Sequence, residues 1–186
     1  MSDLAPGFLV ASPSLQCPFF HHTVVLLVDH SPDGSFGFVI NKPSTITFAG
    51  VTEELDLETT TQIDVPVFSG GPVSPETGWV VFDPRQLNSL PEDAIVLSES
   101  VAVSASLTML HDLAAGTLSC PALLSLGYAG WSEDQLEDEM REGSWIPIDL
   151  DPQLTFEVPI EDRWRHALGT LGIDPARMVG RSIARA

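Results

Sequence analysis

Four side chains near the N-terminus have the chemistry to bind a metal ion. Cys17, His21, His22 and His30 supply one thiol and three imidazoles in a short stretch, but their spacing matches no established set of metal ligands. We predict a strand over residues 21–30, and neighbouring side chains on a strand point to opposite faces. His21 and His22 would then not converge on one ion, so we expect no metal site and no catalytic residue here.

The two cysteines differ in their surroundings. Cys17 precedes a proline in a predicted loop and is the candidate redox-sensitive thiol. A nucleophilic Cys17 would need a base within hydrogen-bond distance; His22 or His111 could serve, although no motif singles out either. Cys120 is expected to be a buried, inert thiol. A chain of this length needs no disulfide, which favours a reducing cytoplasm.

Three irregular segments at the ends of predicted strands form the candidate site for a ligand or partner. They are residues 41–43, 69–72 and 127–131, and loops at strand ends often carry function. If they converge, they could bind a small molecule or form an active site. For segment 69–72, a hairpin or corner turn is favoured over an anion-binding loop, because Pro72 removes one backbone donor. The residues assigned to this candidate site are Asn41, Lys42, Gly70, Gly71, Tyr128, Gly130 and Trp131.

The acid-rich stretch 132–143 predicts a helix with a well-formed start. Ser132 at the N-cap and Gln135 three residues later match a capping box. Glu137 precedes Arg141 by four residues, the favourable orientation for a helical ion pair. Acids in a first helical turn interact favourably with the helix dipole. We therefore interpret these acids as residues that stabilise the start of the helix through its dipole, rather than as a catalytic pair.

The chain is strongly acidic, with 26 acids against 8 bases, a net charge of -18 and a pI near 4.2. Five of the bases lie from Arg163 onward, so a basic segment, 163–186, follows an acidic body. Affinity for nucleic acid comes largely from Lys and Arg, and we find no helix-turn-helix with a basic recognition helix. We expect no direct DNA binding. The longest aliphatic run, 24–28, is too short to span a membrane.

Length and composition favour one domain over residues 1–186, of α+β class, because hairpins dominate over a regular strand–helix alternation. Leu107, Leu110 and Ala114 are predicted to share one face of a helix, with His111 as a further candidate for that face. Strands are predicted at 7–11, 21–30, 35–40, 65–68, 79–82, 94–97, 122–128, 146–150 and 155–158, and helices at 47–57, 104–115, 132–143 and 161–171 and after Asp174.

Five motifs resemble, in order, the YqgE/AlgH family of small bacterial proteins. They are GFLVASP, GFVINKP, SGGPV, LGYAGW with the following QLE, and a late RW with ALGTLGI. The resemblance implies an α+β fold in which a mostly antiparallel bent sheet forms a pseudo-barrel flanked by helices. It also implies a cytosolic bacterial protein that carries the label of transcriptional regulator. No enzymatic activity, catalytic residue or cofactor comes with the family. The near absence of lysine and the titratable segment 17–22 depart from its pattern.

The function expected from these observations is that of a non-enzymatic interaction or regulatory domain in the cytoplasm. It would act on transcription through a protein partner rather than through DNA, and away from membranes; the sequence leaves homo-oligomerisation open. The alternative is a small-molecule-binding protein or enzyme with its site at the three loop segments.

Overall fold

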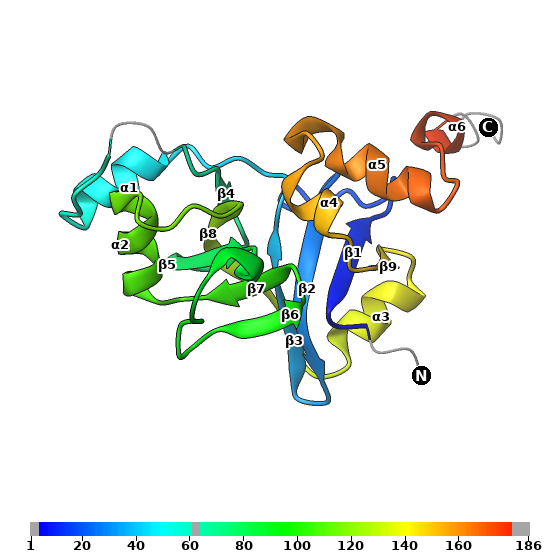
Figure 1. The fold of residues 1–186 in the computed structure, drawn as a ribbon. Coiled ribbons are helices and arrows are strands. Elements are labelled where there is room, and N and C mark those ends of the chain that lie inside the picture. The colour runs from blue at the N-terminus through cyan, green and yellow to red at the C-terminus, as the bar shows by residue number, and fades with distance from the viewer. Residues whose placement is uncertain (1–3, 61–63, 180–186) are drawn as a thin grey trace. The chain divides into compact units, whose positions relative to one another are not determined.

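The computed structural model describes residues 4–60 and 64–179, which form two compact units. Unit 1 takes its residues from the chain up to Asn41 and from Ala129 onward, and unit 2 is Lys42–Tyr128. Strand β8 (Ala122–Trp131) contributes residues to both units. The elements confirm an α+β fold (Figure 1). Pairing among the described strands is antiparallel except between β4 (Val67–Ser69) and β8.

The sheet of unit 1 is an open path of antiparallel strands. The last residues of β8 pair with β3, followed by β2, β1 and β9. Within the described residues no strand pairing closes this path into a barrel. The strand bounds are β1 (Gly7–Ala11), β2 (Val24–Ser31), β3 (Gly34–Val39) and β9 (Trp145–Asp149).

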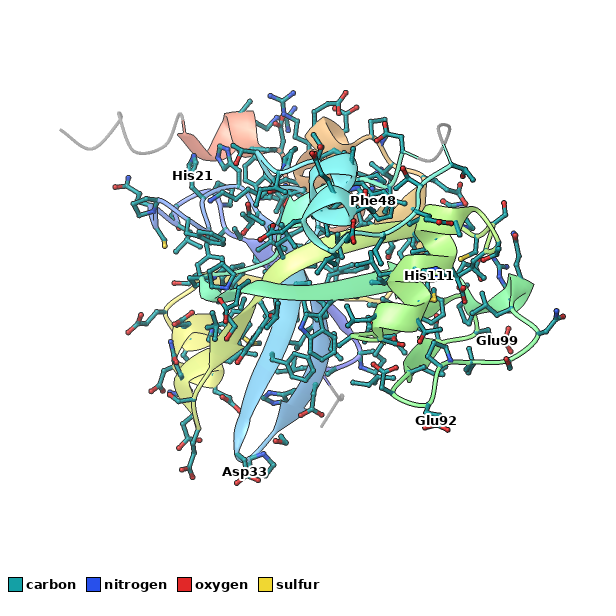
Figure 2. All side chains as sticks on the ribbon, turned by 90° about the vertical axis from the view of Figure 1, so that its left-hand side faces the viewer. His21, Asp33, Phe48, Glu92, Glu99 and His111 are labelled. Atoms are coloured by element: carbon teal, nitrogen blue, oxygen red, sulfur yellow. The ribbon has the colours of Figure 1, made fainter. Side chains whose placement is uncertain are left out.

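Strand β2 is the central strand of unit 1. Its run Val24–Val28 is buried along its whole length, as expected for a strand covered on both faces. It forms the predicted hairpin with β3, and Asp33 marks the tip of the connecting turn (Figure 2). The prediction that this strand begins at His21 is wrong, since residues up to His22 form turns.

Helices cover the sheet of unit 1. The helix α5 packs against β1 and β2, and α3 packs against β3 and β9. The indole of Trp164 in α5 donates a hydrogen bond of 2.8 Å to the Ala11 carbonyl, which fixes the helix to β1. The helical bounds are α3 (Gln135–Arg141), α4 (Pro152–Phe156), α5 (Arg163–Thr170), α6 (Pro175–Val179) and a 3-10 turn (Ile160–Asp162).

The predicted strand at 155–158 is replaced by helix α4. The carboxylate of Asp151 accepts a 2.9 Å hydrogen bond from the amide of Gln153, and Pro152 occupies the first turn. An aspartate N-cap followed by proline is a helix-start pattern. This local helix-start signal explains why residues 155 and 156 are helical where a strand was predicted.

The capping box at the start of α3 is only half formed. The side chain of Gln135 accepts a 3.0 Å hydrogen bond from the amide of Ser132, as the motif requires. The Ser132 hydroxyl also donates to the Gln135 side chain, at 3.2 Å, and does not accept the Gln135 amide, which donates to the Ser132 carbonyl. The prediction that Ser132 is the N-cap is wrong, because α3 begins at Gln135 and Asp134 occupies the cap position. The predicted partner of Arg141 is also wrong, because Arg141 bonds to Asp138 and Glu137 lies 3.4 Å from His30.

Arg163, the first base of the basic segment, is buried, with 4% of its surface exposed. Its guanidinium donates to the carbonyls of Val158 and Ile40. Burial lowers the pKa of Arg163 to about 10. Arg177 lies 3.4 Å from Asp174 at the surface, and Arg181 and Arg185 lie outside the described residues.

Unit 2 is built on a second open path of strands, in the order β6, β7, β5 and β8, with β4 paired to β8. The short strand β7 has no counterpart among the predicted strands. The bounds in this unit are β5 (Val73–Phe82), β6 (Ile95–Ser98), β7 (Val101–Ser104), α1 (Phe48–Glu54), α2 (Leu107–Ala115) and a 3-10 turn (Pro84–Gln86).

The helices α1 and α2 provide one side of the core of unit 2. Met109, Leu113 and Ala114 of α2 are buried with Leu110 against the strands. The prediction that Leu107 shares this face is wrong, because 67% of its surface is exposed. Leu107 is therefore an exposed apolar side chain at the start of α2, and the surface around it is relevant to its role.

Candidate functional site

Four residues of the predicted loop site lie in unit 2, and the backbone joins them. The Ser69 amide donates a 2.9 Å hydrogen bond to the carbonyl of Lys42, and the Gly70 amide donates one of 2.8 Å to the carbonyl of Leu126. Tyr128 is the strand partner of Val73, next to the turn that contains Gly71. Within this unit the segments therefore meet, with the Gly70 amide committed to another strand rather than to a ligand.

The other three residues of that prediction have structural contacts in unit 1. The Asn41 side chain accepts from the Val24 amide at 2.8 Å and donates to the His22 carbonyl at 2.9 Å. Gly130 and Trp131 pair with β3. The side chain of Trp131 is buried.

Trp131 belongs to an aromatic cluster organised by one carboxylate. The indole N–H groups of Trp131 and Trp145 both donate to Oε2 of Glu139, at 3.0 and 2.7 Å. Gln135 donates to the other oxygen at 2.8 Å. The two indole rings meet edge to face with centroids 5.7 Å apart, a favoured aromatic geometry. Glu139 therefore has a structural role, because its carboxylate accepts hydrogen bonds from both indoles and from Gln135.

The segment with the candidate thiol Cys17 folds back on itself in turns. The rings of His21 and His22 stack with centroids 3.6 Å apart, so the prediction that they point to opposite faces is wrong. His22 also stacks on Trp164 at 3.8 Å. The carbonyl of Cys17 accepts a hydrogen bond from the His21 amide, and the thiol is partly exposed. Its sensitivity to oxidation stays a prediction.

The stacked His22 makes the stability of the protein depend on pH. Burial, with smaller contributions from His21 and Arg165, lowers the pKa of His22. The unfolded chain then binds a proton more readily than the folded one as the pH falls past about 6.5. We expect the free energy of unfolding to decrease from about pH 7.5 to about pH 5.5, and to decrease less in His22→Asn. Urea unfolding at the two pH values measures this.

Asparagine is the substitute because His22 has a φ of 56°, and asparagine tolerates the left-handed region. The matched control is His166→Asn, an exposed histidine of α5. An equal loss of stability on acidification in wild type and His22→Asn would show that His22 does not contribute.

The second thiol, Cys120, is partly exposed, so the prediction that it is buried is wrong, and it lies beside the buried Asp83. Burial, reinforced by the charge of Asp83, raises the pKa of the Cys120 thiol, which disfavours the reactive thiolate. The Asp83 carboxylate accepts the Arg85 amide and guanidinium, each at 3.0 Å. Hydrogen bonding from Arg85 lowers the pKa of Asp83. The hydrogen bonds between Asp83 and Arg85 stabilise the turn after β5, and these two residues supply no nucleophile.

Within residues 4–60 and 64–179, no group of three or more His, Cys, Asp and Glu side chains is arranged to hold a metal ion. Over the same residues, no helix has both the length and the apolar character needed to cross a bilayer.

Unit 2 has an apolar groove of about 400 Å³ that no motif in the sequence indicated. Helix α1 and the preceding Ile46 form one wall, the start of α2 another, and β5 and β8 the floor. Ile46, Leu55 and Leu107 are 46%, 43% and 67% exposed at this groove. Large apolar side chains gathered at a concave surface are typical of a binding site. We call this feature the α1–α2 groove.

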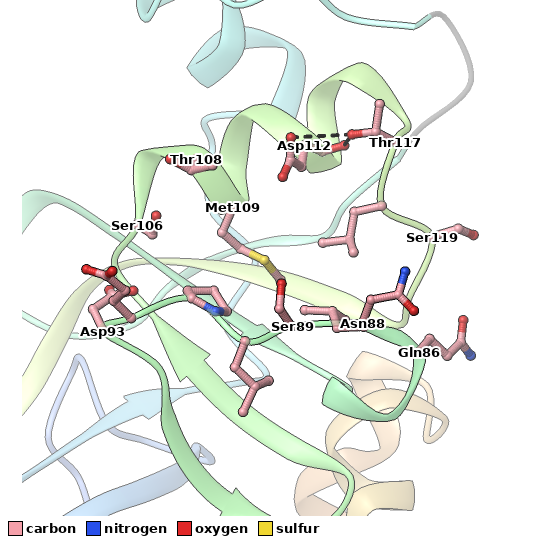
Figure 3. Close-up of a pocket in the computed structure, with 15 residues that line it drawn as sticks. Gln86, Asn88, Ser89, Asp93, Ser106, Thr108, Met109, Asp112, Thr117 and Ser119 are labelled. Atoms are coloured by element: carbon pink, nitrogen blue, oxygen red, sulfur yellow. Dashed lines mark hydrogen bonds between the residues drawn. The ribbon is translucent and has the colours of Figure 1, made fainter.

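A polar hollow of about 860 Å³ lies on the other flank of α2. It is lined by residues 86–93, by residues of α2 with the preceding Ser106, and by 117–119 (Figure 3). Asn88 and Ser89 lie opposite Thr108 and Asp112 in this view. None of the fifteen described lining residues is Lys, Arg or His. We call this feature the polar hollow.

Two α+β units with mostly antiparallel sheets, one inserted in the sequence of the other, define the structural class of the protein. Residues 8–176 match the family model described as AlgH-like. The chain therefore belongs to the AlgH-like family, and the resemblance seen in its motifs is confirmed.

The relatives match over nearly their whole length. A UPF0301 protein of Anaeromyxobacter dehalogenans is 43% identical over 182 residues, which cover 94% of this chain and 91% of the relative. A UPF0301 protein of Vibrio cholerae is 37% identical, with 95% and 96% covered. These names assign no activity.

Two solved structures are similar to this chain. The solution structure of the AlgH protein from Pseudomonas aeruginosa is 35% identical, has a TM-score of 0.78, and covers 96% of this chain and 94% of its own. A crystal structure of a protein from Corynebacterium diphtheriae has a TM-score of 0.68 over 88% and 85% of the two chains. At 23% identity, the second shows a shared fold alone.

Proposed function

We propose that the protein is a non-enzymatic interaction domain of the cytoplasm, and that a protein partner binds in its α1–α2 groove. The observation that supports the proposal is the exposure of Ile46, Leu55 and Leu107 around one apolar hollow. A regulatory effect on transcription would then pass through this partner. The strongly acidic composition disfavours direct contact with nucleic acid.

The groove has the dimensions and lining of a site for apolar side chains. Its floor includes Leu124 and Leu126 of β8, and Leu110 of α2 adjoins them; all three belong to or pack on the core of unit 2. A rigid floor under exposed apolar walls favours burial of a few anchoring side chains, which usually dominate the affinity of an interface. About 400 Å³ falls within the usual range for binding pockets.

The charge of the groove indicates the chemistry of the partner. Glu54 and Glu76 line it, and none of its described lining residues is basic. Apolar anchors flanked by Lys or Arg would therefore be favoured over the same anchors flanked by acids, both in encounter rate and in specificity. An amphipathic segment with i, i+3 and i+4 apolar spacing is one common way to fill such a groove.

The test uses two synthetic amphipathic peptides with the same leucine face, one with lysines and one with glutamates elsewhere. We expect the lysine peptide to bind and the glutamate peptide to bind much more weakly. We expect Leu107→Asp to weaken the lysine peptide by about tenfold, because an anchoring contact is worth about 1.4 kcal/mol or more. Fluorescence anisotropy of the labelled peptides measures both effects.

Leu171→Asp is the matched control, since Leu171 is also an exposed leucine, in unit 1. It adds the same negative charge and removes the same apolar surface away from the groove. If both variants weaken the lysine peptide equally, or if neither does, the peptide is bound by the general acidic field and the proposal is wrong.

A further inference from the structure

We propose that strand β6 is a docking edge, at which an extended segment of a partner protein adds a strand to the sheet of unit 2. The segment has a β-branched apolar centre and Lys or Arg at both ends. This site does not involve the α1–α2 groove and does not depend on the proposed function. Three observations support it: the position of β6 in the sheet, the apolar residues that it exposes, and the charges at its two ends.

Strand β6 has one partner among the described strands. It pairs with β7 in antiparallel register, with Ile95 opposite Val103 and Val96 opposite Ala102, and it stands at the end of the strand order of unit 2. In an antiparallel pair, alternate residues direct their N–H and C=O groups away from the partner strand. The outer edge of β6 therefore offers main-chain donors and acceptors to a further strand.

The side chains of β6 suit an apolar partner strand. Ile95 is 39% exposed and Val96 is 54% exposed, and successive strand residues point to opposite faces. Natural sheet edges are often protected by lysine or proline, and β6 contains neither. By contrast β9, the edge strand of unit 1, has Pro147 at its centre. β-branched residues of an added strand would pack beside Ile95 and Val96 on both faces.

The regular edge of β6 is short, so an added strand needs further interactions at its ends. The register with β7 shifts between Val96 and Ser98. Exposed acids, Glu92 and Glu99, lie just outside the two ends of the strand, and Figure 2 shows both on the same flank of unit 2. None of residues 86–128 is Lys or Arg. Basic residues at the ends of an added strand would therefore be attracted without local competition.

The same acids distinguish a partner protein from a second copy of the chain. If two copies paired antiparallel, with Ile95 of each opposite Val96 of the other, Glu92 of one copy would approach Glu99 of the other. Like charges opposite each other destabilise a strand pair. The edge is thus protected against self-association but open to a strand of opposite charge.

Peptide binding to the full-length protein tests the proposal. The probe is a labelled peptide with the centre Thr-Val-Ile-Val-Thr and lysines at both ends. A second peptide carries N-methyl groups on its central amides, and a third has glutamates in place of the lysines. We expect only the first to bind well, because the site needs main-chain hydrogen bonds and opposite charge. Fluorescence anisotropy at an ionic strength of about 0.15 M gives the Kd values. Hydrogen exchange followed by NMR should show protection of β6 amides.

Val96→Lys should raise the Kd of the lysine peptide about tenfold, the effect of losing one anchoring contact. Lysine is common at sheet edges, and Val96→Thr, which keeps the β-branched shape, should act in the same direction if Val96→Lys fails to fold. The control Leu171→Lys adds the same charge at an exposed leucine of unit 1 and should change the Kd less than about twofold. Leu107→Asp in the α1–α2 groove should have as little effect.

Three results would overturn the proposal by showing that general attraction to an acidic protein is all that acts on the peptide. They are absence of saturable binding, equal binding of the N-methylated peptide, and equal weakening by Val96→Lys and Leu171→Lys. Weakening by Leu107→Asp but not by Val96→Lys would assign the peptide to the α1–α2 groove instead. A dimer in sedimentation experiments that Val96→Lys dissociates would show that a second copy occupies this edge, which also contradicts the proposal.

Discussion

Gly70→Ala should lower the free energy of unfolding by about 3 kcal/mol, at the upper end for overpacking a core. A Cβ at Gly70 would lie 1.7 Å from the Ser125 hydroxyl and 2.5 Å from the Gly127 carbonyl oxygen. The serine is fully buried, and the carbonyl belongs to the backbone of β8, so neither can yield cheaply. The midpoint of thermal unfolding, followed by circular dichroism, should fall by about 10 °C.

Gly78→Ala is the matched control in the same unit. A Cβ there would meet only the Leu124 side chain, at an ordinary contact distance of 3.5 Å. Its stability should differ from wild type by no more than about 0.5 kcal/mol. Equal stability of the two variants would show that β4 and β8 separate easily at Gly70, and would reopen this turn as a place for a ligand.

Glu139→Ala should destabilise the protein by about 3 kcal/mol, because it leaves two buried indole N–H groups without their acceptor. Each unsatisfied buried donor costs about 1–3 kcal/mol, and Trp131 and Trp145 are only 6% and 3% exposed. Glu139→Gln keeps one acceptor oxygen and should lose less. Urea unfolding followed by circular dichroism gives the stabilities, and tryptophan fluorescence reports the cluster directly.

Glu142→Ala controls for loss of an acid from the same segment, since Glu142 is exposed at the end of α3. Its stability and its tryptophan emission should stay close to those of wild type. If Glu139→Ala matches it in both, the indole groups find other acceptors and Glu139 does not organise the cluster.

The sequence predicts those elements whose signals are local. The run 24–28 in the strand predicted at 21–30, the connection to the strand predicted at 35–40, and Thr47 at the start of the helix predicted at 47–57 each act over a few residues. The structure contains the hairpin and the helix that they indicate. The Thr47 hydroxyl accepts the Gly50 amide at 3.1 Å, as a cap should.

The elements that were missed depend on distant partners or on competing signals. Strand β7 has four residues, and its pairing with β5 and β6 makes it a strand. In α2, apolar residues occur at two overlapping helical spacings, and packing selects Met109 and Leu113 over Leu107. No linker-like composition marks the unit boundaries at Asn41 and Tyr128, because β8 runs continuously through the second one.

Neither the α1–α2 groove nor the polar hollow could be predicted from the sequence, because their lining residues come from separate elements and form no motif. The α1–α2 groove draws on residues from Ile46 to Leu126. The exposed position of Leu107 was the one available signal, and it can be recognised only when the buried face of α2 is known. For the loop site, the positions of the glycines were informative about close packing, not about chemistry.

The division of unit 1 into two stretches of sequence has a consequence for its synthesis. While the ribosome translates Lys42–Tyr128, at roughly 5–20 residues per second, β1, β2 and β3 have left it without β9 or α5. The apolar hairpin of β2 and β3 therefore remains without β9 and α5 for several seconds. All residues of unit 2, by contrast, are synthesised before unit 1 is complete. In a growing polypeptide, the inserted unit can therefore complete its fold before the unit that surrounds it in sequence has all of its strands and helices.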